Sequence, residues 1–127
     1  MTNILKSVLL VGAGSFAGGA LRYLISLAIK PANGFPAATF AVNIAGCLLI
    51  GLLYGIFARY PSLDKGLLLL LTTGFCGGFT TFSTFASESL AMLQGGHYQN
   101  FALYALLSVV LGIAAVFCGG LLAKIRF

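Results

Sequence analysis

The sequence has very little charge of either sign. Only 7% of its 127 residues are charged, and just two of these are acidic. Soluble globular domains carry roughly a quarter charged residues, so this chain cannot cover itself with a water-facing surface. Intrinsic disorder is excluded as well, because disordered chains have low hydrophobicity, whereas 60% of these residues are apolar. The composition therefore indicates an integral membrane protein, small enough to be one domain.

Other scarce residues exclude further classes of protein. The seven Lys and Arg give a net charge of +5, but they are scattered and form no patch for a phosphate backbone. The single histidine, His97, lies in a turn without an acidic neighbour, so acid–base catalysis is poorly supported and no enzyme is expected. The three cysteines lie in apolar stretches, where we interpret them as packing residues because they fit neither disulfides nor a metal site: Cys47, Cys76 and Cys118.

Long charge-free stretches divide the chain into four parts. A bilayer is crossed by about 20 mostly apolar residues in a helix. We predict spans near residues 4–29, 37–58, 66–94 and 101–123, joined by short turns rich in Pro, Asn and Gly. The expected fold class is all-α and integral to the membrane, with a single membrane domain over residues 1–127.

Four spans place both termini on one side of the membrane. Two cations, Arg22 and Lys30, then lie toward the opposite side. The other five lie on the side of the termini, which the positive-inside rule places in the cytoplasm: Lys6, Arg59, Lys65, Lys124 and Arg126.

Small residues predict how the helices associate. Seventeen glycines are about twice the usual share, and pairs four residues apart let helix backbones approach closely in lipid. Such pairs are Gly14 and Gly18, Gly51 and Gly55, and Gly74 and Gly78. Four short helices bury little among themselves, so we expect a homo-oligomer with its site at the subunit interface.

The third span is different in kind. Residues 72–85 hold three glycines, four phenylalanines and six hydroxyl side chains at mid-membrane. Glycine costs a helix about 1 kcal/mol relative to alanine, so we predict an interrupted helix. Such backbone persists at membrane depth only where protein buries it or a polar cavity borders it, and it commonly forms transport sites. The alternative is a glycine-rich packing seam whose hydroxyls bond to their own helix.

Single polar residues in the apolar stretches also indicate a transport site, and each has a structural alternative. Arg22 either extends to the interface or faces a vestibule that attracts anions. Asn43 makes either a structural bond between helices or a polar lining, and Glu88 is the only carboxylate within a span. A ladder of hydroxyls is the further possibility, from Ser83, Thr84, Tyr104 and Ser108, although each alone is also satisfied within a helix.

Three stretches in this order resemble the Fluc family of small fluoride ion channels, over essentially the whole chain. They read GGALR at 18–22, TFAVNIAG at 39–46 and GFCGGFTTFSTF at 74–85, the last followed by Glu88. The third is the most specific. The resemblance implies an antiparallel, dual-topology homodimer with a broken third helix and two narrow pores. It also implies passive, selective export of cytoplasmic fluoride across the bacterial inner membrane.

The resemblance also assigns roles to residues. Phe82 and Phe85 correspond to the paired pore phenylalanines, Asn43 to the pore amide and Arg22 to the vestibule cation. Gly77 and Thr80 would offer backbone carbonyls to a structural sodium ion at the dimer centre. The polar track would continue through Ser83, Thr84, Glu88, Tyr104 and Ser108. Hydroxyls, the amide and the positive edges of phenyl rings are suitable replacements for the water around fluoride.

Two other functions are compatible with four short spans, and the distribution of charge differs from that of the family. A small proton-coupled multidrug exporter is the leading alternative, but it would centre on a Glu in the first span, and this chain has none there and no tryptophan. A non-transporting assembly subunit would leave the third span unexplained. The five-to-two distribution of cations departs from the balance expected of dual topology. A fixed orientation beside an oppositely oriented partner chain is the alternative to the homodimer.

Overall fold

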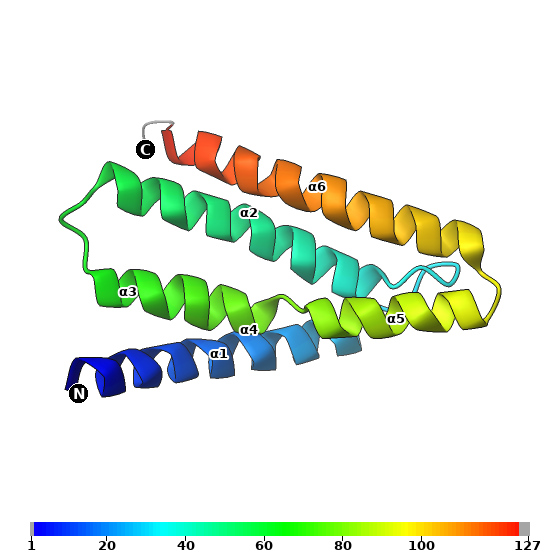
Figure 1. The fold of residues 1–127 in the computed structure, drawn as a ribbon, viewed down its shortest axis with the longest axis horizontal. Coiled ribbons are helices and arrows are strands. Elements are labelled where there is room, and N and C mark those ends of the chain that lie inside the picture. Colours follow the sequence, from blue (N-terminus) through cyan, green and yellow to red (C-terminus); the bar gives the residue numbers. More distant parts are fainter. Residues whose placement is uncertain (1, 125–127) are drawn as a thin grey trace.

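The computed structural model describes residues 2–124, and every regular element in that range is helical. Arg126, one of the cations assigned to the cytoplasmic side, lies outside the described residues. In chain order the elements are α1 (Thr2–Ala28), α2 (Ala37–Arg59), α3 (Lys65–Leu69), the π-helix η1 (Leu70–Cys76), α4 (Gly77–Phe79), α5 (Phe82–Gln94) and α6 (Tyr98–Lys124) (Figure 1).

Within residues 2–124, four segments are long and apolar enough to cross a membrane: Asn3–Ala28, Ala37–Arg59, Lys65–Gln94 and Tyr98–Lys124. The third comprises α3, η1, α4 and α5. The predicted all-α class with four spans is confirmed, and the chain is a multi-pass membrane protein.

The last helix begins three residues earlier than predicted, at Tyr98. The preceding helix, α5, ends in a compact glycine cap. Gly96 has a φ of 77°, its amide donates to the carbonyl oxygen of Leu93 at 3.2 Å, and the amide of His97 donates to that of Met92 at 2.8 Å. This pair of bonds is a Schellman motif. It ends α5 within a turn of three residues, so that α6 begins directly after His97.

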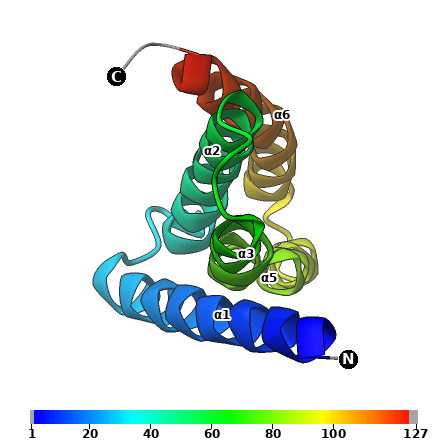
Figure 2. The same cartoon turned by 90° about the vertical axis from the view of Figure 1, so that its left-hand side faces the viewer.

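The helices form two parallel pairs (Figures 1 and 2). In one pair α2 lies beside α6, and in the other α1 lies beside the third span, running in the opposite direction from the first pair. The two termini therefore lie at the same end of the molecule, together with the loop between α2 and α3.

Glycines lie at both helix contacts. A Cβ on Gly51 would meet the backbone of Val116 on α6, and one on Gly14 or Gly18 would meet backbone atoms of Phe75. A Cβ on Gly78 would meet the backbone of Ser15. The prediction that these glycines allow close helix contact is confirmed.

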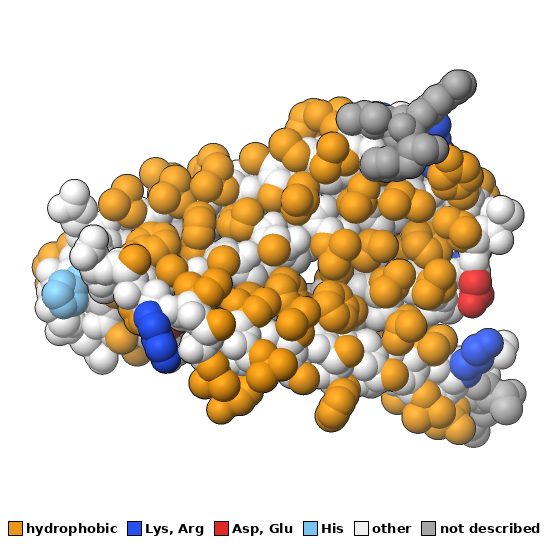
Figure 3. All heavy atoms as spheres, turned by 180° about the vertical axis from the view of Figure 1, so that it is seen from behind, with side chains coloured by type: hydrophobic (Ala, Val, Ile, Leu, Met, Phe, Trp, Pro, Cys, Tyr) orange, Lys and Arg blue, Asp and Glu red, His pale blue; other side chains and the backbone are white. Residues whose placement is uncertain are grey.

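The outer surface suits lipid. Figure 3 shows hydrophobic side chains spread over the length of the molecule, with charged side chains near its ends. Phe16 on α1 is 81% exposed, and Ile113 and Phe117 on α6 are 68% and 67% exposed. A soluble protein would not leave so many large apolar side chains in contact with solvent.

Candidate functional site

The backbone of the third span leaves helical conformation at two residues. Thr80 has φ −87° and ψ 159°, and Thr81 has φ −151° and ψ 119°, both extended. The last amide of the first half, that of Thr80, donates to the carbonyl oxygen of Cys76 at 3.0 Å. The next helix, α5, then begins with Thr81 as its N-cap, whose hydroxyl oxygen accepts from the amide of Thr84 at 3.1 Å. A hydroxyl at this position satisfies one of the amides that a helix start leaves free.

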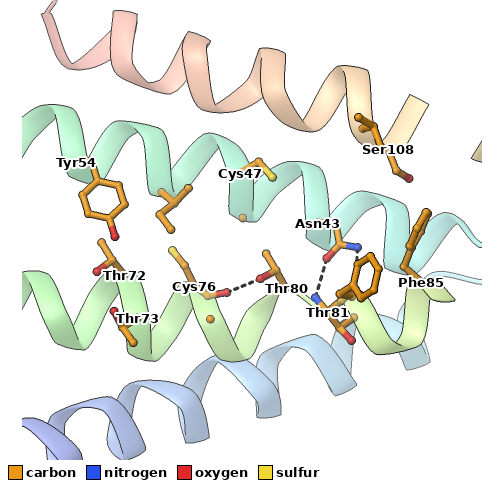
Figure 4. Close-up of a pocket in the computed structure, with 15 residues that line it drawn as sticks. Asn43, Cys47, Tyr54, Thr72, Thr73, Cys76, Thr80, Thr81, Phe85 and Ser108 are labelled. Carbon is orange, nitrogen blue, oxygen red and sulfur yellow. Dashed lines mark hydrogen bonds between the residues drawn. The ribbon is translucent and has the colours of Figure 1, made fainter. Parts of the chain in front are cut away.

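Asn43 of α2 pairs with the extended backbone. Its Oδ1 accepts from the Thr81 amide at 2.8 Å, and its Nδ2 donates to the Thr81 carbonyl oxygen at 3.2 Å (Figure 4). The side-chain amide thus pairs with both backbone groups of Thr81 in the manner of a neighbouring strand, and it satisfies a backbone N–H that has no helical acceptor. One N–H of the two on Nδ2 remains for another acceptor.

The interruption also frees backbone carbonyls. In a continuous helix the Thr81 amide would donate to the carbonyl oxygen of Gly77, but here it donates to Asn43. The neighbouring carbonyl of Gly78 accepts from Nε of Arg22 at 3.2 Å, and that of Gly74 accepts from the Ser15 hydroxyl at 3.3 Å. Helix α1 therefore satisfies carbonyls on one side of the third span, while the Gly77 oxygen loses its helical donor.

A groove of about 540 Å³ runs along the opposite side of the third span, bordered by α2 and α6. We call it the central groove. Figure 4 shows side chains of α2 and of the third span facing each other across it. Its lining residues are Asn43, Gly46, Cys47, Ile50, Tyr54, Thr72, Thr73, Cys76, Gly77, Thr80, Thr81, Phe82, Phe85, Ser108 and Val109.

Six of the predicted site residues line this groove together: Asn43, Gly77, Thr80, Phe82, Phe85 and Ser108. The Ser108 hydroxyl is buried without a hydrogen-bond partner among the described residues. A buried hydroxyl without a partner costs free energy unless something binds it, so Ser108 offers an unused donor and acceptor to the groove.

The two phenylalanines expected at the pore are neighbours on α5. The ring centroids of Phe82 and Phe85 lie 5.9 Å apart, with the ring planes at 42°. Phe82 is 79% exposed, whereas Phe85 packs on Tyr104 with centroids 4.9 Å apart. Phe75 and Phe79 stack on each other, with ring centroids 5.7 Å apart.

Glu88 and Tyr104 form a separate polar pair, and Phe85 packs on the Tyr104 ring. The Tyr104 hydroxyl donates to Oε1 of Glu88 at 3.0 Å, and Tyr104 is completely buried. Neither residue lines the central groove.

The remaining predicted positions lie apart from the groove. Arg22 contacts the third span from α1, on the side away from it. The Thr81 hydroxyl donates to the hydroxyl oxygen of Thr84 at 3.1 Å. The hydroxyl oxygen of the exposed Ser83 lies 3.3 Å from that of Thr81. Of the hydroxyls expected to form a ladder, those of Ser83 and Thr84 thus lie against Thr81, and that of Tyr104 bonds to Glu88.

Sequence reasoning missed several residues of the site. Thr81 both caps α5 and receives Asn43, and only its place as a hydroxyl residue before a helical stretch pointed to the cap. Cys47 and Cys76 pack as expected but also line the groove. Phe35, in the loop before α2, contacts Tyr104, and no local pattern indicated this.

The donor set near the interruption suits a hard monovalent cation. Within residues 2–124 no three His, Cys, Asp or Glu side chains cluster to hold a metal ion. Backbone carbonyl oxygens bind such ions in selectivity filters, and the Gly77 oxygen has lost its helical donor through the Asn43 bond. The Gly77 carbonyl oxygen would suit such an ion, and Thr80 lines the same groove.

Four apolar spans, one of them interrupted beside a groove of neutral donors and aromatic rings, define a small membrane transport protein. Comparison with protein families places the chain more narrowly. The family model described as CrcB-like protein, Camphor Resistance (CrcB), matches residues 9–120, and the chain belongs to this family.

Curated relatives align over nearly their whole length. A protein of Phocaeicola vulgatus is 48% identical over 117 residues, which cover 91% of this chain and 96% of the relative. A protein of Chlorobaculum tepidum is 48% identical over 123 residues, which cover 96% of this chain and 98% of the relative. One of Prosthecochloris aestuarii is 45% identical over 126 residues, or 98% of each. All three are named fluoride-specific ion channel FluC.

Proposed function

We propose that this chain is a fluoride-specific ion channel of the bacterial inner membrane, through which cytoplasmic fluoride leaves the cell passively. The observation that carries the proposal is the interruption at Thr80 and Thr81, held open by Asn43 beside a groove of neutral donors. The relatives, named fluoride-specific ion channels, support the same function. They are named as channels, not as enzymes.

The groove offers what a dehydrated fluoride ion needs. Asn43 retains one N–H, and the Ser108 hydroxyl has no hydrogen-bond partner in the described part of the chain. The rings of Phe82 and Phe85 carry positive edges and border the same groove. Neutral donors at short range replace water around a small anion without binding it so tightly that it cannot leave.

A second copy of the chain completes the pore. The groove is open along one side, and Phe82, one of its lining residues, is 79% exposed. In an antiparallel homodimer these surfaces face each other, so that each of two pores receives residues from both copies. Gly77 and Thr80 of each copy would hold a sodium ion at the centre. When bound, that ion supplies positive charge that makes an anion nearby less costly.

Ion efflux from liposomes tests the proposed function. Purified protein should release fluoride rapidly and retain chloride, and Phe82→Ile or Asn43→Ala should abolish the fluoride release. The matched control is Phe16→Ile, which alters a ring that is 81% exposed on α1 and outside the groove. Equal release of both halides contradicts a selective channel. Strict dependence on a proton gradient would favour a coupled exporter, and no release of either ion a non-transporting subunit.

Cross-linking tests the antiparallel dimer. In a background with the native cysteines replaced by serine, Tyr60→Cys at the end of α2 and Tyr98→Cys at the start of α6 place exposed thiols at opposite ends of the molecule. An antiparallel pair predicts cross-links between the two variants when they are mixed, and none between two Tyr60→Cys chains. Cross-links only between identical positions would contradict it.

A further inference from the structure

The loop between α1 and α2 is a tight, well-bonded turn. Asn33 and Gly34 both have positive φ, 54° and 80°, which is the conformation of the two central residues of a type I′ turn. On either side, Ala32 and Phe35 exchange backbone bonds of 3.0 Å and 2.9 Å. Nδ2 of Asn100 on α6 donates to the carbonyl oxygen of Asn33 at 3.2 Å, so the turn is attached to the last helix.

This turn places the ring of Phe35 against Tyr104. The centroids of the two rings lie 5.4 Å apart, with the planes at 78°, an edge-to-face contact. Phe40 contacts Phe35 in the same manner at 5.4 Å and 75°. Phe85, which lines the central groove, packs on Tyr104 at 4.9 Å. Tyr104 is thus held between the loop and the groove.

The pair that Tyr104 makes with Glu88 depends on this enclosure. The phenol donates to the carboxylate at 3.0 Å, and Tyr104 has no exposed surface. Water that reached the phenol would compete for the hydrogen bond, which is stronger when it is kept dry. Of the two rings that contact Tyr104 among residues 2–124, that of Phe35 belongs to a loop and that of Phe85 to α5.

We propose that Phe35 is a positioning residue of the ion pathway, which rests on the proposed function. Its ring excludes water from Tyr104 and fixes the phenol on Glu88, and through Tyr104 it keeps Phe85 in place at the groove. Phe35 acts through Tyr104 and does not contact the ion. The turn at Asn33 and Gly34 is the means by which the loop holds the ring in position.

The single glutamate of the chain gives a direct test. Because Glu88 is the only Glu, ¹³C-glutamate labelling yields one carboxyl resonance by NMR. Tyr104→Phe, which removes the hydrogen bond, defines the shifted position of that resonance. We expect Phe35→Ala to move the resonance toward this position, Phe35→Tyr to leave it near that of the parent, and the exposed Phe16→Ala to have no effect. An unmoved resonance in Phe35→Ala overturns the proposal.

Fluoride efflux tests the link to the pathway. Phe35→Ala should slow efflux by about tenfold, a size typical of coupled neighbours, and Phe35→Tyr should retain it. In a Tyr104→Phe background, Phe35→Ala should add little. If Phe35→Ala slows fluoride efflux by the same factor in both backgrounds, or does not slow it at all, Phe35 does not act on the pathway through Tyr104.

A second variant tests the turn without removing the Phe35 ring. Gly34→Ala disturbs the turn without altering Phe35 itself, because Gly34 has φ 80° and its Cβ would lie 3.2 Å from Nδ2 of Asn100. It should move the resonance in the same direction as Phe35→Ala. A parent protein that conducts no fluoride would overturn the proposed function, while the resonance would still decide whether Phe35 holds the Tyr104–Glu88 pair.

Discussion

At the scale of single residues, Asn43 has two tasks at one place. Two of its hydrogen-bonding positions hold the backbone of Thr81, and one N–H remains for the groove. The sequence left open whether Asn43 is structural or lines a pathway, and these two readings are compatible. Its partner could not be foreseen, because Thr81 lies 38 residues away and is extended only in the folded chain.

Ser108 separates a functional role from a structural one. Its hydroxyl is buried without a partner, so Ser108→Ala should leave the free energy of unfolding unchanged or raise it by up to about 1 kcal/mol. Fluoride efflux should nevertheless fall several-fold, because a donor leaves the groove. Ser89→Ala is the matched control: this hydroxyl is also buried and unpartnered, but it does not line the groove. Equal efflux in the two variants would contradict a role for Ser108.

At the scale of elements, the sequence predicts an interruption within residues 72–85 but not its position. The glycines at 77 and 78 remain helical, and a π-helix precedes them over Leu70–Cys76. The helix ends only at Thr80, and Asn43 of α2 bonds to the backbone of the next residue, Thr81. Propensity therefore identified a weak helix, and a tertiary contact decided where it opens. The partner of Arg22 could not be predicted from the sequence either, because its bond to the Gly78 carbonyl requires α1 to lie beside the third span.

The cap of α5 gives a prediction at this scale. The Thr81 hydroxyl oxygen accepts from the Thr84 amide, so Thr81→Ala should lower the free energy of unfolding by about 1 kcal/mol. Thr81→Ser keeps the hydroxyl and should retain the stability of the parent. Thermal unfolding in detergent measures the difference. An alanine variant as stable as the serine variant would show that the cap contributes nothing.

At the scale of the whole molecule, the scarcity of charge and the polar turns together located the four spans. The predicted spans match the helices closely, although Arg22 and Glu88 lie within them. The arrangement of the helices could be anticipated only as close contact at glycines. Their pairing, α1 with the third span and α2 with α6, depends on which glycines face which backbone, and a sequence pattern does not contain this.

The contact between α2 and α6 predicts a contrast between adjacent glycines. A Cβ on Gly119 would lie 2.6 Å from the amide nitrogen of Leu52, whereas one on Gly120 would have nothing within 4 Å. Gly119→Ala should therefore lower the free energy of unfolding by about 1–3 kcal/mol through overpacking. Gly120→Ala should be neutral or slightly stabilising, because alanine favours a helix. Thermal unfolding decides, and equal effects of the two variants would contradict the described helix contact.

The most direct test of the central claim, a passive and selective fluoride pathway, is the reversal potential of the current in a planar bilayer. With a tenfold fluoride gradient and equal chloride on both sides, a fluoride-selective channel reverses near the fluoride equilibrium potential, about 59 mV for a monovalent ion. A proton gradient should leave that potential unchanged. Reversal near zero, or a potential that follows the proton gradient, would contradict the claim.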